Sequence, residues 1–96
     1  MSYIAMNRFE VVSGKEEAFE DVWRNRQSYL DEVPGFIEFH LLKGEDGVYL
    51  SHALWADEAS FKAWTESESF RAAHASGASR GMLKGPPQLG LYHVVI

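Results

Sequence analysis

Apolar and polar residues alternate along four short stretches of the chain, and this period of two predicts four strands. The first stretch covers residues 2–12, and its apolar side chains fall on both faces: Tyr3, Ala5, Phe9 and Val11 on one, Ile4, Met6 and Val12 on the other. The next two stretches cover 36–43 and 48–55, and the short polar Gly-Glu-Asp-Gly segment between them predicts a hairpin. The last strand is expected over residues 89–96.

A different spacing follows the first strand, where apolar residues recur three and four positions apart from Ala18 to Val33. This spacing predicts an amphipathic helix. Ser13 with Glu16 three residues later forms a capping-box pattern, which places the start of the helix directly after Ser13. The Pro-Gly pair at 34–35 is expected to end it.

A second helix is predicted after the hairpin. Asp57 is a suitable N-cap, and the helix that follows carries Phe61 and Trp64. A further helical piece should begin at residue 67 or 68 and stop near Gly77. Residues 77–88 are rich in glycine and proline and are expected to form an irregular loop.

The resulting order, β-α-β-β-α-β, predicts a ferredoxin-like α+β domain over residues 1–96, with one antiparallel sheet and helices over one of its faces. The strands carry apolar side chains at both parities, for example Phe39 and Leu41 against Phe36 and Leu42. The face without helices is therefore too apolar for water. We expect a homodimer in which two sheets pack together; the alternative is a monomer with a few exposed apolar residues.

Composition narrows the class of protein. A chain of 96 residues buries only about two-thirds of its unfolded surface, which favours extra burial in a dimer. The absence of cysteine excludes a thiol nucleophile and a cysteine-ligated metal. A net charge of −5 argues against a nucleic-acid partner. With no apolar run of about 20 residues and no signal-peptide pattern at the start, we expect a cytoplasmic protein without membrane contact.

Few residues suggest chemistry by themselves. The sequence has no nucleophile-elbow serine and no glycine-rich phosphate loop. His40, His52 and His93 lack the spacing of zinc ligands and are expected at the surface or an interface. His74 is different because small alanines flank it, so a flat ligand could approach its imidazole, and one neutral imidazole suffices to bind a haem iron. A packed or solvated histidine is the alternative.

Two further residues are unusual in their places. Asn7 lies in the middle of the first strand, where asparagine is disfavoured. If its side chain points under the helices, the buried amide needs hydrogen-bond partners. Trp64 lies one helical turn from Phe61 and could be ordinary core, although its indole N–H would also need an acceptor.

Together, these residues resemble a known site. Asn7 in the first strand, Trp64 in the Phe-Lys-Ala-Trp stretch and His74 in the Phe-Arg-Ala-Ala-His stretch are similar to the Asn–Trp–His triad of bacterial haem-degrading monooxygenases. These enzymes, of staphylococcal and mycobacterial type, belong to the antibiotic-biosynthesis-monooxygenase (ABM) superfamily. The Val-Pro-Gly-Phe junction at 33–36 is similar as well, but it is typical of the whole superfamily.

The resemblance implies a dimeric α+β barrel in which each subunit holds one haem between its sheet and its helices. Haem would be both substrate and oxygen-activating cofactor. His74 would bind the iron, and Asn7 would donate a hydrogen bond to the distal ligand. Trp64 would press against the porphyrin and hold it out of plane, since distortion of the macrocycle is one way a protein tunes haem.

The resemblance also suggests contacts at the edges of the haem. Arg26, Arg80 and Lys84 are candidates for the propionates, and Trp23 and Arg26 would face the distal pocket. Trp23 is bulkier than the residue expected there, which leaves the cleaved position open, and with it the product: biliverdin with carbon monoxide, or an oxo-bilirubin with formaldehyde. The reaction would use O2 and electrons from an external donor, an unidentified reductase, because no flavin or nicotinamide site is visible.

Two other functions are compatible with the same residues. The first is a cofactor-free monooxygenase acting on a phenolic or quinol substrate in the same cleft, with His74 as the base and Asn7 or Trp64 as a hydrogen-bond donor. The second is a non-enzymatic barrel that binds haem or another small ligand, with a structural His74. Stoichiometric haem binding and haem consumption distinguish the three.

Overall fold

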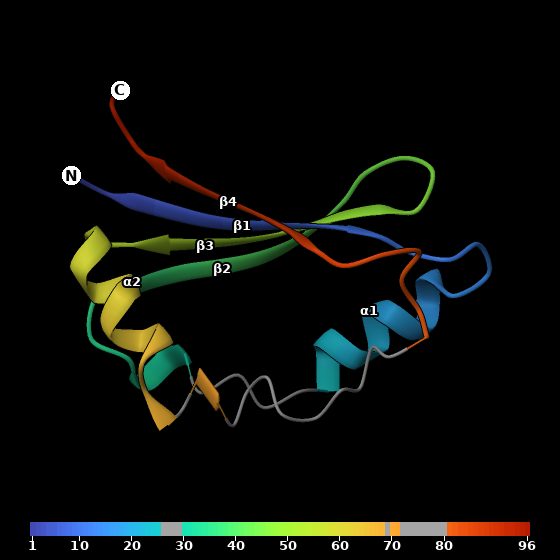
Figure 1. The fold of residues 1–96 in the computed structure, drawn as a ribbon, viewed down its shortest axis with the longest axis horizontal. Coiled ribbons are helices and arrows are strands. Elements are labelled where there is room, and N and C mark those ends of the chain that lie inside the picture. The colour runs from blue at the N-terminus through green and yellow to red at the C-terminus, as the bar shows by residue number, and fades with distance from the viewer. Residues whose placement is uncertain (26–29, 69, 72–80) are drawn as a thin grey trace.

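The computed structural model describes residues 1–25, 30–68, 70–71 and 81–96. Its elements, in chain order, are β1 (Tyr3–Glu10), α1 (Glu16–Asn25), a 3₁₀ turn η1 (Leu30–Glu32), β2 (Phe36–Lys43), β3 (Val48–Trp55), α2 (Glu58–Thr65) and β4 (Gln88–His93). The strands form one antiparallel sheet in the order β2-β3-β1-β4. Both helices lie on the same side of the sheet (Figure 1). The predicted ferredoxin-like α+β fold is confirmed.

Local signals around the hairpin and the second helix act as predicted. β2 and β3 have the predicted bounds. The Asp57 carboxylate accepts a hydrogen bond of 2.8 Å from the backbone N–H of Ser60, which caps α2. The Ser67 hydroxyl accepts one of 3.2 Å from the N–H of Phe70, as expected for a helical piece that starts near residue 67. The predicted stop at Gly77 lies outside the described residues.

The first helix differs from its prediction at both ends. Gly14 has a φ of +88°, so residues 13–14 form a turn and Ser13 is not the cap. The first helical hydrogen bond runs from the N–H of Phe19 to the carbonyl of Lys15. Towards the other end, α1 is described only to Asn25, and Leu30–Glu32 form a separate 3₁₀ turn, so no continuous helix runs to Val33.

The first and last strands in chain order, β1 and β4, are shorter than predicted. β1 covers Tyr3–Glu10 instead of 2–12, and Val11 makes only an isolated bridge with Leu83. β4 covers Gln88–His93 instead of 89–96. Its last pair is His93 with Tyr3, and beyond it the Val94 N–H still donates to the carbonyl of Ser2.

The core on the helix side consists of two clusters. The α1 cluster contains Phe9, Val11, Phe19 and Tyr49. The α2 cluster contains Tyr3, Ala5, Leu30, Trp55 and Phe61. Between the two clusters, β1 and β3 carry short side chains, which leave the space for the site described below.

The face of the sheet away from the helices is not covered (Figure 1). It carries Ile4 and Met6 on β1 and Leu50 and Leu54 on β3, all partly buried, together with exposed Leu42 and Tyr92. His40 and His52 are cross-strand partners on the same face. Within the described ranges, no helix is long and apolar enough to span a membrane.

Candidate functional site

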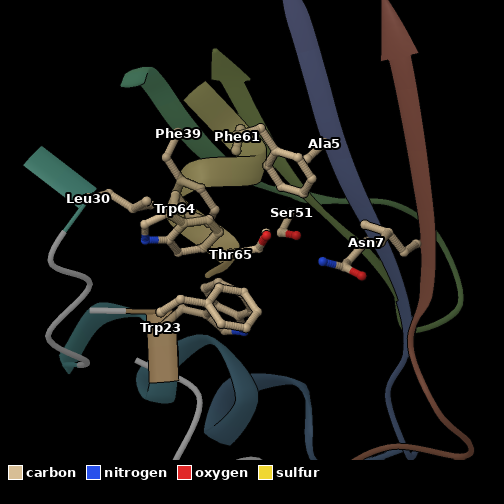
Figure 2. Close-up of a pocket in the computed structure, with 12 residues that line it drawn as sticks. Ala5, Asn7, Trp23, Leu30, Phe39, Ser51, Phe61, Trp64 and Thr65 are labelled. Carbon is tan, nitrogen blue, oxygen red and sulfur yellow. The ribbon is translucent and has the colours of Figure 1, made fainter. Parts of the chain in front are cut away.

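A cavity of about 280 Å³ lies between the sheet and the helices (Figure 2). All four strands contribute to its wall, and so do α1 and α2. The described residues that line it are Ala5, Asn7, Trp23, Leu30, Phe39, Ser51, Ala53, Phe61, Trp64, Thr65, Phe70 and Leu89. This volume lies just below the usual range for small-molecule pockets, roughly 300–1,000 Å³.

The register of the sheet explains why the cavity exists. Ala5 and Ala53 are direct cross-strand partners on β1 and β3, and so are Asn7 and Ser51. All four project towards the helices, because side chains on one strand alternate between faces with a period of two. Four short side chains in a two-by-two block leave space above the sheet that the neighbouring clusters do not fill.

The sheet side of this space carries two polar side chains next to each other. Ser51 is only 6% exposed, and it is the one buried polar residue in the part of the chain that the structure describes. Asn7 is partly buried and lies opposite it. Cross-strand neighbours of this kind have Cβ atoms about 4.5–5.5 Å apart. The amide of Asn7 can donate and accept hydrogen bonds, as can the hydroxyl of Ser51.

The helix side of the cavity is aromatic. Trp64 packs against Trp55 and Phe70, with ring centroids 5.4 and 4.8 Å away, and against Phe61 at 6.4 Å. Trp23 stacks on Phe39 with an interplanar angle of 14°. Because other rings hold these two indoles, they offer fixed, flat surfaces to a ligand.

No ionisable side chain is among the described lining residues. This part of the wall can therefore exclude water, stack on a ring and form hydrogen bonds, but it cannot act as a general acid or base. The arrangement fits a flat, largely apolar ligand with a polar atom near Asn7 and Ser51. Any acid–base group or iron ligand must come from elsewhere in the chain or from the ligand itself.

The structure brings three of the predicted site residues together: Asn7, Trp23 and Trp64 line this one cavity. Lys84 does not line it; its backbone N–H donates to the carbonyl of Glu10, beyond the end of the sheet pairing with β4. Arg26, His74 and Arg80 lie outside the described residues.

Sequence reasoning missed Ser51, although a signal was present. Position 51 has the same parity as Tyr49, Ala53 and Trp55, which places it on the apolar, helix-covered face of β3. Ser51 is a polar residue among apolar neighbours on one face of its strand, and this is as unusual as Asn7 in the middle of the first strand.

Comparisons with known proteins give consistent results. The family model for antibiotic biosynthesis monooxygenase matches residues 2–76. The structure of the haem degrader MhuD from Mycobacterium tuberculosis, with two haems bound in its active site, is 27% identical, with a TM-score of 0.80; the match covers 98% of this chain and 96% of that one. A mutant of SnoaB, a cofactor-independent oxygenase from Streptomyces nogalater, is 25% identical with a TM-score of 0.77, covering 99% and 94%. A Bacillus cereus protein of 19% identity and TM-score 0.78 shares the fold.

Proposed function

The chain belongs to the antibiotic biosynthesis monooxygenase family, and on that premise we propose that it is a haem-degrading monooxygenase. It binds one haem per subunit and opens the porphyrin ring oxidatively, using O2 and electrons from a separate reductase, with release of iron and a bilin. One observation carries this proposal: Asn7 and Trp64, which are 57 positions apart in the sequence, line a single cavity between sheet and helices.

The described wall of the cavity offers flat aromatic and hydrogen-bonding surfaces to such a ligand, and the part of a haem that exceeds its volume of about 280 Å³ would extend beyond it. Haem, when bound, supplies the iron that activates dioxygen and the ring that is oxidised. The indole of Trp64 would press on the flat face of the ligand, and the rings of Trp55 and Phe70 behind it would resist its displacement. The amide of Asn7 would donate a hydrogen bond to the distal ligand, and the apolar lining would exclude water there and strengthen that bond.

The remaining roles fall on residues outside the described part and on one surface residue. His74 is the proposed iron ligand, and Arg26 and Arg80 are proposed partners of the propionates. Lys84 is exposed and keeps this proposed role only for a ligand edge that extends beyond the cavity. The likeness to MhuD, whose structure holds haem in its active site, supports these assignments.

A second candidate is a cofactor-free oxygenase acting on a phenolic or quinol substrate. The small volume of the cavity favours it, since about 280 Å³ suits a molecule of two or three fused rings. The likeness to SnoaB, a cofactor-independent oxygenase, supports it as well. In this case His74 is the base, and the same Asn7 amide holds the substrate oxygen.

The assembly proposed for either reaction is a cytoplasmic homodimer. The uncovered face of the sheet exposes Leu42 and Tyr92 and carries four further partly buried apolar side chains. A second copy packed on this face would remove them from water and form a barrel of two sheets. The helix-side cavity would remain outside that interface.

The proposal is tested by titrating the protein with haemin and then adding ascorbate or a reductase in air, followed by absorption spectroscopy. We expect a Soret band that saturates at one haem per subunit and then bleaches, with release of iron. The absence of a saturable band contradicts the proposal in favour of an organic substrate. A Soret band that forms but persists after reductant is added in air would show that the protein binds haem without degrading it.

Two variants locate the iron ligand. His74→Ala should lose the spectrum of the histidine-ligated haem. His40→Ala is the matched control, because this exposed histidine lies on the opposite face of the sheet and should leave the spectrum unchanged. An unchanged spectrum in His74→Ala would show that another group binds the iron.

A further inference from the structure

We propose that Ser51 is a second ligand-binding residue of the cavity, and that Ser51 and Asn7 together hold one oxygen atom on the edge of a planar aromatic ligand. Neither the resemblance to haem-degrading enzymes nor the predicted triad includes this serine. The inference rests on the proposed function only for the location of the ligand, and it does not require haem.

The burial of Ser51 is the first argument. The residue is only 6% exposed, and its neighbours along β3 on the same face are Tyr49 and Ala53. Among the described residues its hydroxyl makes no hydrogen bond to protein. The hydroxyl oxygen is not fully enclosed by protein and the residue lines the cavity, so the hydroxyl is open to a ligand atom or a water that enters there.

The register of the sheet is the second argument. Reading across the sheet from β2 to β4, the residues at this level are Leu41, Ser51, Asn7 and Leu89. Two hydrogen-bonding groups therefore sit side by side, with a leucine beyond each. Such a pair fixes the position of one polar atom of the ligand. A second polar atom of the ligand at the same level would meet only leucine.

The chemistry of the pair selects the kind of atom. A phenolic hydroxyl can donate to one member and accept from the other, and a carbonyl oxygen can accept from both. An apolar substituent of the same size at this position leaves both side chains without partners. Discrimination against an analogue that lacks a hydrogen-bonding group is large when a site is built to bind that group.

Thr65 provides an internal contrast. It also lines the cavity, but its hydroxyl donates a hydrogen bond of 2.7 Å to the carbonyl of Lys62 within its own helix. The proton of this hydroxyl is already used, so Thr65 cannot donate to a ligand in the same conformation. Thr65→Val is therefore the matched control for Ser51→Ala.

The experiment uses the full chain without haem and two probes of nearly equal shape, 1-naphthol and 1-methylnaphthalene. Calorimetric titration gives the ratio of their dissociation constants, which measures discrimination for the oxygen atom. The wild type should prefer 1-naphthol by about tenfold or more, which corresponds to the contribution of one or two hydrogen bonds. Ser51→Ala should reduce this ratio about fivefold, while Thr65→Val should leave it within about twofold of the wild type.

Additional variants separate binding from folding. Ser51→Thr keeps the hydroxyl and should retain the preference for 1-naphthol. Combining Asn7→Ala with Ser51→Ala should lower the ratio by less than the product of the two single effects, because the two residues hold the same atom. A thermal melt of each variant confirms that it is folded before titration.

The inference is overturned if Ser51→Ala keeps the wild-type ratio, if Thr65→Val loses as much as Ser51→Ala, or if neither probe binds the wild type. The haemin titration separates this result from the fate of the proposed function. Preference for 1-naphthol without haem binding contradicts haem degradation and leaves Ser51 in its role. Haem degradation without that preference removes Ser51 from the site and leaves the proposed function intact.

Discussion

Two neighbouring residue pairs on the same face of β1 and β3 differ in almost every respect. Phe9 faces Tyr49, and two residues further along each strand, about 7 Å away, Asn7 faces Ser51. Phe9 and Tyr49 are buried and pack against Phe19 from α1. Asn7 and Ser51 border open space instead.

Electrostatic contacts strengthen the first pair further. The Tyr49 hydroxyl donates to the Glu20 carboxylate on α1, and the Lys43 ammonium lies 3.2 Å from the same carboxylate. The hydrogen bond from Tyr49 lowers the pKa of Glu20 most, and the hydrogen bond from Lys43 is the next largest cause. The Phe9–Tyr49 pair thus packs α1 against the sheet, whereas the polar groups of the Asn7–Ser51 pair face the cavity.

The difference shows that adjacent levels of one sheet can serve different purposes. The Phe9–Tyr49 level contributes to stability, and the Asn7–Ser51 level is available for binding. A closely packed level tolerates little change in volume. A level left open and polar loses folding free energy relative to a filled one, which is common where a site must accept a ligand. The same type of mutation should therefore destabilise the closed level strongly and the open level only slightly.

Removing side-chain volume should show the largest contrast. Phe19→Ala deletes a fully buried ring that contacts Phe9, Trp23 and Tyr49, and it should lower the free energy of unfolding by about 3–5 kcal/mol. Ser51→Ala should change it by no more than about 0.5 kcal/mol. Urea unfolding of both variants measures the difference, and a loss at Ser51 comparable to that at Phe19 would contradict the comparison.

Adding volume should give a smaller effect of the same kind. Val11→Phe inserts a ring into the closed α1 cluster, where Val11 is 1% exposed, and should destabilise by about 1–3 kcal/mol. Ala53→Leu extends into the cavity and should cost less than about 1 kcal/mol while weakening ligand binding. Thermal melts and a haemin titration of the two variants check both statements. If Val11→Phe and Ala53→Leu were equally destabilising, the cavity would not have room for the larger side chain at position 53.

The smallest effect concerns pH. A carboxyl with a lowered pKa in the folded state contributes stability above its ordinary pKa, and this contribution is lost as the pH falls through the lowered value. Glu20 should therefore contribute stability at neutral pH that disappears in the acid range. Tyr49→Phe removes the main cause of the shift, so the melting temperatures of wild type and variant should converge as the pH falls. A difference that stays constant down to strongly acid pH would assign the effect to packing.

The sequence was most informative where the determinants are local. The hairpin strands and the Asp57 cap followed their predictions, because a polar turn and a capping carboxylate act within a few residues. The first helix was predicted to run to Val33 because Leu30 and Val33 continue the helical spacing of Trp23. Leu30 instead lies in the 3₁₀ turn η1, and both residues pack against the α2 cluster. Periodicity alone does not distinguish these two cases.

The site was only partly predictable, for a related reason. Asn7 could be predicted as a site residue from its residue type, because asparagine is disfavoured in a strand. Ser51 can be recognised as a site residue mainly from the register, which places it opposite Asn7. Strand register joins residues 44 positions apart, and no local pattern encodes it. The cavity itself depends on the coincidence of small residues on β1 and β3, which follows from the same register.

A crystal structure of the haemin-saturated protein tests the central claim most directly, because the two faces of the sheet offer competing locations. We predict that the macrocycle lies on the helix side, with one face against Trp64 and its distal side towards Asn7. It would be contradicted by a haem bound on the uncovered face, held by His40 and His52, with the helix-side cavity empty.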